Sequence, residues 1–238
     1  MMYRAYDGVE SGCAMVKPVV YTDFDGVLNA FPNDKMMRRG GQKRLDRLKD
    51  GDPRKALYDL DNAFLLDRTR RVPTPMGKFR VRWSGELAGC IGAMASEGSI
   101  ELHWLSTWQP FTAVLNETLG WDAETVDTVT WYDPVSGHGR LTGKRRTVFR
   151  RVEVERESEN PGPIIWIDDE ECYDSVAMQV ESLEPAAPVL MVRPDDRIGI
   201  SRRQWRLIER FAADPASFAS VTFDEEPTIR NRSGHIGF

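Results

Sequence analysis

Four short apolar runs, each followed at once by charged or hydroxyl side chains, constrain the fold of this chain more than any other feature. They span residues 19–22, 100–105, 164–167 and 189–192, and a weaker run lies at 126–131. Continuous apolar runs of this length are typical of strands buried on both faces of a parallel sheet. Because parallel strands direct their carboxyl ends to one edge of the sheet, we expect the polar residues that follow the runs to share that edge.

Helical patterns separate these runs. Apolar residues recur at helical spacing over 109–119 and 171–184, and Ser201 with Gln204 predicts a capping box at the start of a last helix. Strands that alternate with helices predict an α/β fold with a doubly wound, Rossmann-like and mostly parallel sheet of about five strands. The predicted organisation is an N-terminal extension at 1–17, a main domain at 18–213 and a C-terminal tail at 214–238.

Composition excludes several classes of protein. Of the 238 residues, 41% are hydrophobic and 29% are charged, which rules out a disordered chain and a small disulfide scaffold. The net charge of −5 does not indicate nucleic-acid binding by the protein as a whole. Three cysteines without close spacing favour a reducing compartment, and no apolar stretch has the length of a membrane span. These features predict a soluble, cytoplasmic protein with no membrane partner.

The connection between the first two strong runs is too long for a plain crossover. An insertion at about 26–84 is therefore expected to form a lid or small cap over the strand ends. Period-two alternation at 78–83 predicts one arm of a hairpin, and 42–65 predicts one or two short helices. Basic side chains gather in the insertion, with no acid among residues 68–82. Two interpretations stay open: the cations surround the substrate, or they form a solvated face.

The segment that starts at Asp23, directly after the first apolar run, carries the strongest chemical signal. Asp23 and Asp25 place two carboxylates at a strand end, where one can attack as a nucleophile while the other shuttles a proton. Gly26 permits a sharp chain reversal. Like charges packed at a strand end repel each other unless a cation lies between them. A catalytic acidic site is therefore favoured over an acidic turn without chemistry.

With Asp-Phe-Asp-Gly after an apolar strand, the sequence resembles the haloacid dehalogenase superfamily of phosphohydrolases, whose first motif is Asp-x-Asp-Gly. Residues 103–108, 141–146 and 166–170 match the second, third and fourth motifs in order. The resemblance covers residues 17–213 and implies that the main domain is catalytic. It is closest to a branch with a Trp-x-x-x-Trp second motif and an Asp-Asp fourth motif. Some members of that branch are associated with RNA repair and nucleic-acid end processing.

The resemblance implies a role for each acidic and basic motif residue. Asp23 would be the nucleophile and Asp25 the proton donor, and Lys144 would balance the charge that develops on the phosphoryl group. Mg²⁺ would be held by Asp23, by the backbone carbonyl of Asp25 and by a third ligand. Because the fourth motif lacks the Gly-Asp-x-x-x-Asp of many members, the third ligand stays open between Asp168 and Asp169.

Further residues are candidates for phosphate and substrate binding. Either Ser106 or Thr107 would donate a hydrogen bond to a phosphate oxygen, with Ser106 favoured by its place at the strand end. Asp174 is a candidate for a supporting role, with a solvated helix carboxylate as the equal alternative. The candidates for substrate binding are Gly26, Asn29, Arg80, Arg82 and Trp108. Core packing is the favoured role for Trp108, with base stacking as the alternative.

Two functions follow from these observations. The first is a Mg²⁺-dependent phosphomonoester hydrolase that acts through an aspartyl-phosphate intermediate, and the proton donor Asp25 favours it over a dehalogenase. Its substrate would be a phosphorylated small molecule, such as a nucleotide or sugar phosphate, or the terminal phosphate of a nucleic acid. The second is a catalytically inactive binding or regulatory module with the same fold. The intact set of four motifs favours the enzyme.

Overall fold

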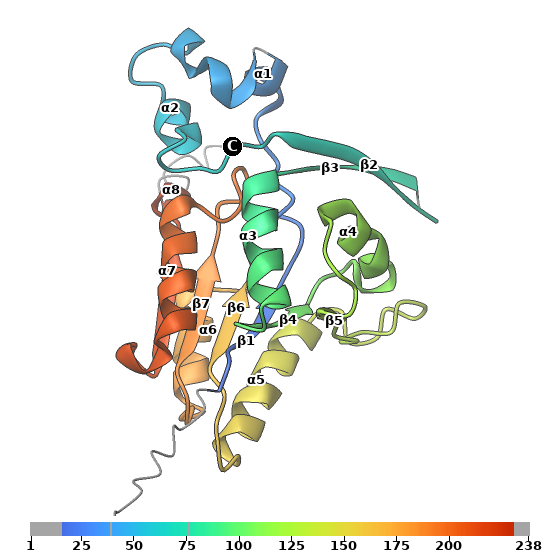
Figure 1. Cartoon of the computed structure of the whole chain (residues 1–238), viewed down its shortest axis with the longest axis vertical. Coiled ribbons are helices and arrows are strands. Elements are labelled where there is room, and N and C mark those ends of the chain that lie inside the picture. Colours follow the sequence, from blue (N-terminus) through green and yellow to red (C-terminus); the bar gives the residue numbers. More distant parts are fainter. Residues whose placement is uncertain (1–15, 39, 76, 231–238) are drawn as a thin grey trace, which may run out of the picture.

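A six-stranded parallel sheet forms the centre of the computed structural model, which describes residues 16–38, 40–75 and 77–230. The strands run in the order β5-β4-β1-β6-β7-β8, and every neighbouring pair is parallel (Figure 1). Their bounds are β1 Val19–Thr22, β4 Glu101–Trp104, β5 Val126–Thr128, β6 Ile164–Ile167, β7 Val189–Arg193 and β8 Val221–Glu225. The predicted α/β fold with a mostly parallel sheet is confirmed.

Helices cover both faces of the sheet, which makes the fold doubly wound. One face packs against α3 (Gly85–Ser96), α4 (Thr112–Leu119) and α7 (Arg202–Ala213), and the other against α5 (Gly143–Arg156) and α6 (Asp174–Glu181). In β1, Val20 faces the first layer, whereas Val19 and Tyr21 face the second. Since side chains alternate along a strand, burial on both faces requires the continuous apolar runs seen in the sequence.

The order of the strands determines where a ligand can bind. With the hairpin strands set aside, the chain forms β1, β4 and β5 on one side and then returns to form β6, β7 and β8 on the other. The direction of winding therefore reverses between β1 and β6. In open α/β sheets, ligands bind beyond the carboxyl ends of the strands at this reversal. Asp23 follows β1 and Asp168 follows β6, so the two predicted acidic segments meet there.

The sixth strand lies in the segment predicted as a polar tail. Strand β8 pairs with β7 along its whole length, preceded by a short η3 helix (Pro215–Ser217) and followed by α8 (Pro227–Arg230). Its residues are only partly buried, as expected for an edge strand. Asp224 and Glu225 pair with Arg203 of α7 and Arg193 of β7, which neutralises the acids that gave this segment its polar character. The sheet therefore extends beyond the predicted boundary at 213.

The insertion lies beyond the carboxyl ends of the strands (Figure 1). It contains α1 (Asp34–Arg38), η1 (Gly41–Arg47), α2 (Pro53–Tyr58) and the hairpin strands β2 (Arg68–Thr74) and β3 (Gly77–Trp83). Asp52 caps α2 by accepting a hydrogen bond from the Arg54 amide, which explains why the chain turns at 50–53. The predicted short helices and the predicted hairpin arm are confirmed.

The two faces of the hairpin differ in chemistry. Val72, Val81 and Trp83 are buried in the core, and they lie on the same face as Phe79. The register places Arg71 opposite Arg80, and these side chains share the other face with Lys78 and Arg82. Four basic side chains therefore lie on the face opposite the buried one, whereas Arg68 and Arg70 share the face of Trp83 and Val81 and remain exposed.

Some predictions concern the cellular compartment or fall on residues that the structure does not describe. Cys90 and Cys172 are free, whereas Cys13 lies outside the described residues, as does most of the predicted N-terminal extension. Among the described residues, no helix combines the length and the apolar character that crossing a membrane requires. The cytoplasmic location stays a prediction.

Candidate functional site

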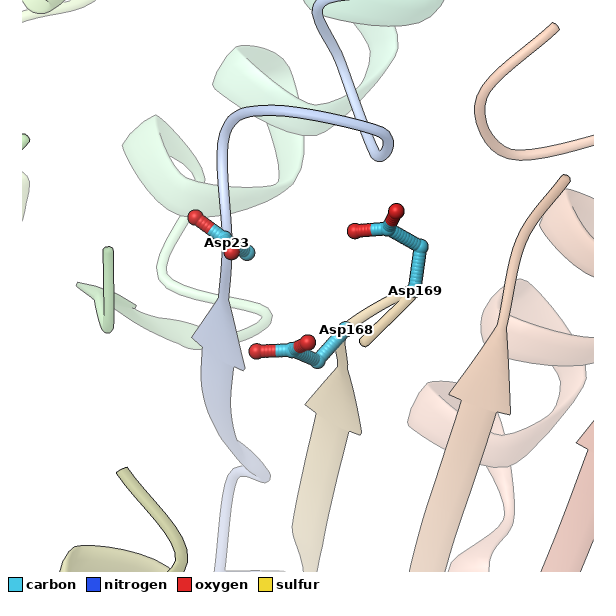
Figure 2. A group of neighbouring side chains, drawn as sticks. All are labelled: Asp23, Asp168 and Asp169. Carbon is cyan, nitrogen blue, oxygen red and sulfur yellow. The ribbon is translucent and has the colours of Figure 1, made fainter. Parts of the chain in front are cut away.

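Asp23, Asp168 and Asp169 form a cluster at the carboxyl ends of β1 and β6, here called the acidic centre. Each of them offers a carboxylate oxygen within 4.8 Å of an oxygen from the other two. Figure 2 shows Asp168 and Asp169 directing their carboxylates toward the end of β1, where Asp23 lies. Adjacent strands place the three side chains together, because β1 and β6 pair in register up to Thr22 and Ile167. Both residues predicted as alternative third ligands therefore belong to the cluster.

Lys144, the second residue of α5, reaches the acidic centre from the side. Its ammonium donates hydrogen bonds to Asp23 Oδ2 and to Asp168 Oδ2, the latter at 2.9 Å. Its side chain is only 7% exposed. Burial alone would lower the pKa of Lys144, but the Asp23 and Asp168 carboxylates outweigh it and raise the pKa. Lys144 is therefore a fixed positive charge between two carboxylates.

The acidic centre has three carboxyl groups, and among the described residues Lys144 is the only cation paired with them. Burial raises the pKa of Asp169 to about 8, and the neighbouring charges of Asp168 and Asp23 add to the rise. Among the described residues, no cationic side chain pairs with the Asp169 carboxylate, in contrast to the other two. With all three carboxyl groups ionised, one ammonium would leave two negative charges, and this repulsion contributes to the raised pKa of Asp169. An all-oxygen donor set with this excess fits a hard divalent cation such as Mg²⁺.

Asp168 is held rigidly by the chain that follows it. Its Oδ1 accepts hydrogen bonds from the amides of Glu170 and Glu171, at 2.9 and 2.8 Å, while Oδ2 takes the bond from Lys144. Complete burial raises the pKa of Asp168 to about 6, although Lys144 acts in the opposite direction. Asp168 therefore positions Lys144, and Asp169 has the freer carboxylate of the pair.

Gly26 allows the loop after β1 to approach the acidic centre. Its φ of 70° lies in the left-handed region that favours glycine. A Cβ at this position would overlap the carboxylate of Asp169. The predicted chain reversal thus has a second purpose, since it brings the backbone of the loop directly against an acidic side chain.

Asp25 is not one of the three carboxylates of the acidic centre, although it lies two residues after Asp23. Its carboxylate accepts a hydrogen bond from Asn29 Nδ2 at 2.6 Å and another from Trp108 Nε1 at 2.9 Å. Burial raises the pKa of Asp25 despite these two donors. Asn29 Oδ1 in turn accepts the amide of Arg82 at 2.8 Å, so this asparagine connects the loop to the hairpin. Asp23 and Asp25 therefore have separate surroundings suited to separate tasks.

The structure places the two candidate hydroxyls differently. Ser106 is fully buried after β4, and its Oγ accepts the amide of Trp108 at 3.3 Å, which leaves the hydroxyl proton to be donated elsewhere. Thr107 is half-buried and lines a pocket together with Asp25. Which of the two binds a phosphate oxygen stays a prediction. Asp174 is exposed in the first turn of α6, as expected for a solvated helix carboxylate.

The pocket beside Asp25, here called the aromatic pocket, has a volume of about 440 Å³. Its walls come from the hairpin, from the turn after β4 and from the loop after β5. Rings predominate, as the lining includes Phe79, Trp108, Pro110, Phe111, Tyr132 and Pro134. Trp108 is buried, as its predicted role in core packing requires, and its Nε1 also donates a hydrogen bond to Asp25, whereas base stacking stays a prediction. Phe79 and Tyr132 were not among the predicted site residues. The alternation at 78–83 nevertheless predicts that Phe79 lies on the other face of its strand from Arg80 and Arg82.

Arg80 and Arg82 lie on the other side of the hairpin. With Arg71 and Lys78 they line a separate cavity of about 530 Å³, here called the basic hollow, which also includes Phe31 and Asp34. Arg82 Nη1 lies 3.5 Å from Asp34 Oδ1. The structure therefore does not bring these two arginines into the pocket that Asp25 lines.

The geometry thus groups the predicted residues into an acidic centre with Lys144, a pocket beside Asp25 and a basic hollow across the hairpin. Comparison with known proteins finds no matching family model, no matching curated protein and no matching solved structure. The acidic centre at the reversal of the sheet is consequently the main basis for a functional conclusion.

Proposed function

We propose that this protein is a Mg²⁺-dependent phosphomonoester hydrolase that acts through an aspartyl-phosphate on Asp23. The observation that carries the proposal is the division of surroundings between two aspartates on one loop. Asp23 lies in the acidic centre, paired with Lys144. Asp25 lines the aromatic pocket, and its pKa is raised. Two titratable groups in contrasting environments are typical of an active site in which one group acts as the nucleophile and the other as the acid.

In the first step, a carboxylate oxygen of Asp23 attacks phosphorus and the bond from phosphorus to the ester oxygen breaks. Asp25 gives its proton to the departing alkoxide, which leaves as the alcohol. Lys144 holds Asp23 in position through its hydrogen bond and neutralises part of the charge on the transferred group. Asn29 and Trp108 keep the carboxyl of Asp25 on the side of the leaving group.

In the second step, the Asp25 carboxylate takes a proton from a water molecule, whose oxygen attacks phosphorus. The bond between phosphorus and Asp23 breaks, so inorganic phosphate is released and the Asp23 carboxylate returns. Asp23 and Asp169, with the backbone carbonyl of Asp25 and with Asp168 as the alternative ligand, would hold Mg²⁺. The bound ion supplies charge neutralisation and in-line positioning of the phosphoryl group.

The proposed substrate is a nucleotide or the terminal phosphate of a nucleic acid. Two features support this class: the basic hollow within the insertion and the pocket of aromatic side chains next to Asp25. Cations attract a polyanion, and rings offer stacking surfaces for bases. The proposed cellular location is the cytoplasm.

A screen of phosphomonoesters tests the proposal against the alternative of an inactive module. The panel contains nucleotides, sugar phosphates and oligonucleotides that are phosphorylated at the 3′ or the 5′ end, each with Mg²⁺ and with EDTA. We expect phosphate release from at least one ester with Mg²⁺ and loss of release with EDTA. Absence of release across the panel, from protein shown to be folded, would favour the inactive module.

A further inference from the structure

The aromatic pocket lies where the leaving group of the proposed reaction must be. Asp25 can protonate the departing alkoxide only if that oxygen comes within hydrogen-bond reach of its carboxyl group. The carboxyl forms part of the wall of this pocket, and Trp108 Nε1 holds it there. The carbon skeleton attached to the ester oxygen must therefore extend into the space among the rings.

Phe79 lines the aromatic pocket with a ring that the protein buries only in part. It lies on the hairpin face whose other apolar side chains, Val72, Val81 and Trp83, are 7% exposed or less, yet Phe79 itself is 43% exposed. Its ring meets the Trp108 ring edge to face, with the centroids 5.7 Å apart at 75°. A large apolar side chain on an inward-directed face is left exposed at a cost unless something covers it.

Tyr132, a second aromatic residue that lines the pocket, is held in place by its neighbours. Tyr132 donates its hydroxyl hydrogen bond to the backbone oxygen of Thr107 at 2.9 Å, and its ring lies 4.6 Å from the Trp131 ring. Rings fixed in this way lose little conformational entropy when a ligand binds. Edge-to-face and offset-stacked contacts with such walls are available only to another π-system, whereas a puckered aliphatic ring gains burial alone.

We propose that the substrate is a phosphomonoester whose alcohol carries a flat aromatic ring, and that Phe79 is the residue that selects it. This inference rests on the proposed function, since it uses Asp25 as the proton donor. It deepens that function by naming the chemical class of the group that is released. A nucleoside belongs to the class, as do smaller aryl-substituted alcohols.

Benzyl phosphate and cyclohexylmethyl phosphate provide the test. Both release a primary alcohol of similar size, so they differ mainly in whether the ring is flat. We expect kcat/KM with Mg²⁺ to be about 2- to 12-fold higher for benzyl phosphate, the range that one aromatic pair contributes. Phe79→Leu should bring the ratio close to one.

The matched control is Phe31→Leu. Phe31 is 49% exposed on the other side of the hairpin, where it lines the basic hollow, so this substitution should leave the ratio of the two esters as in the wild type. A wild-type ratio of one or below, or a benzyl preference that survives Phe79→Leu, would overturn the inference.

A binding measurement separates this inference from the proposed function. 2-Phenylethylphosphonate and 2-cyclohexylethylphosphonate have the shapes of the two esters but cannot be hydrolysed at the bond from carbon to phosphorus. Their dissociation constants, measured by calorimetry with Mg²⁺, should show the same preference for the flat ring and the same loss of it in Phe79→Leu. Without turnover of either ester, the proposed function fails while the two phosphonates still decide whether the pocket selects a ring. Equal dissociation constants overturn the inference in either case.

Discussion

The acidic centre and the basic hollow both concentrate charges of one sign, but the protein holds them in different ways. Asp23 and Asp168 are buried and share an ammonium, and Asp168 is also fixed by two backbone amides. Arg71 and Arg80 are exposed and face each other across the hairpin. Buried like charges are costly without a counter-ion, whereas exposed ones are screened by water and salt. The acidic centre is therefore the stronger indication of function.

The largest effect should follow from removing the nucleophile from the acidic centre. Asp23→Asn replaces the attacking carboxylate with an amide, and we expect kcat to fall about 10⁶-fold, the scale seen when a covalent catalyst loses its nucleophile. Phosphate release under saturating substrate measures it. Asp127→Asn is the matched control, because Asp127 is an exposed aspartate on the edge strand β5. Wild-type turnover by Asp23→Asn would show that the nucleophile lies elsewhere.

The second largest effect concerns stability, because loss of a cation should cost more in the acidic centre than in the basic hollow. Lys144→Met removes the only cation paired with Asp23 and Asp168 among the described residues, so we expect the free energy of unfolding in EDTA to fall by about 3–5 kcal/mol. Arg80→Met removes an exposed cation of the basic hollow and should change it by no more than about 0.5 kcal/mol. Denaturant titration measures both. Similar losses for both variants would contradict the distinction between the regions.

Stabilisation of the protein by Mg²⁺ should depend on the acidic centre and not on the basic hollow. With Mg²⁺ at 100 times its dissociation constant, we expect the free energy of unfolding to rise by about 2.7 kcal/mol. Asp169→Asn should weaken this gain, because it removes the carboxylate that has no cationic partner among the described residues. The double variant Arg80→Ala/Arg82→Ala should keep the gain in full. Thermal melts with sodium chloride at matched ionic strength provide the control, and an equal gain from sodium would exclude a specific site.

The smallest effect is expected at the basic hollow. Arg80→Ala/Arg82→Ala should raise KM for a phosphorylated oligonucleotide about 2- to 10-fold, since exposed ion pairs contribute little each. KM for a small ester and kcat for both substrates should stay close to the wild type, because the lost contacts bind ground and transition states alike. The difference should shrink as salt rises. If the substitution leaves KM unchanged for both substrates, these arginines form only a solvated face.

The sequence predicts the acidic centre well because buried parallel strands leave little freedom. A continuous apolar run ends where burial ends, and strand register then places Asp23 and Asp168 side by side. The hairpin is harder to interpret. Alternation separates Phe79 and Val81 from Arg80 and Arg82, but only tertiary packing decides which face meets the core. The expectation that these arginines surround the substrate depended on that choice.

The last strand escaped prediction for a related reason. Val221–Glu225 lies at the edge of the sheet and is only partly buried, so it lacks a continuous apolar run. Two of its five residues are acidic, and their neutralisation by Arg203 and Arg193 comes from distant parts of the chain. Long-range ion pairs of this kind leave no periodic pattern in the sequence. A partly polar edge strand therefore looks like a tail.

Detection of the phosphorylated nucleophile tests the central claim most directly. Asp25→Asn should slow hydrolysis of the intermediate, because an amide cannot take the proton from water. With 4-nitrophenyl phosphate, whose leaving group needs no proton, the first step should still proceed. After an acid quench of a single turnover with Mg²⁺, we predict a phosphate on the peptide that contains Asp23, and none in the double variant with Asp23→Asn. Release of 4-nitrophenol by Asp25→Asn without phosphate on Asp23 would contradict the claim.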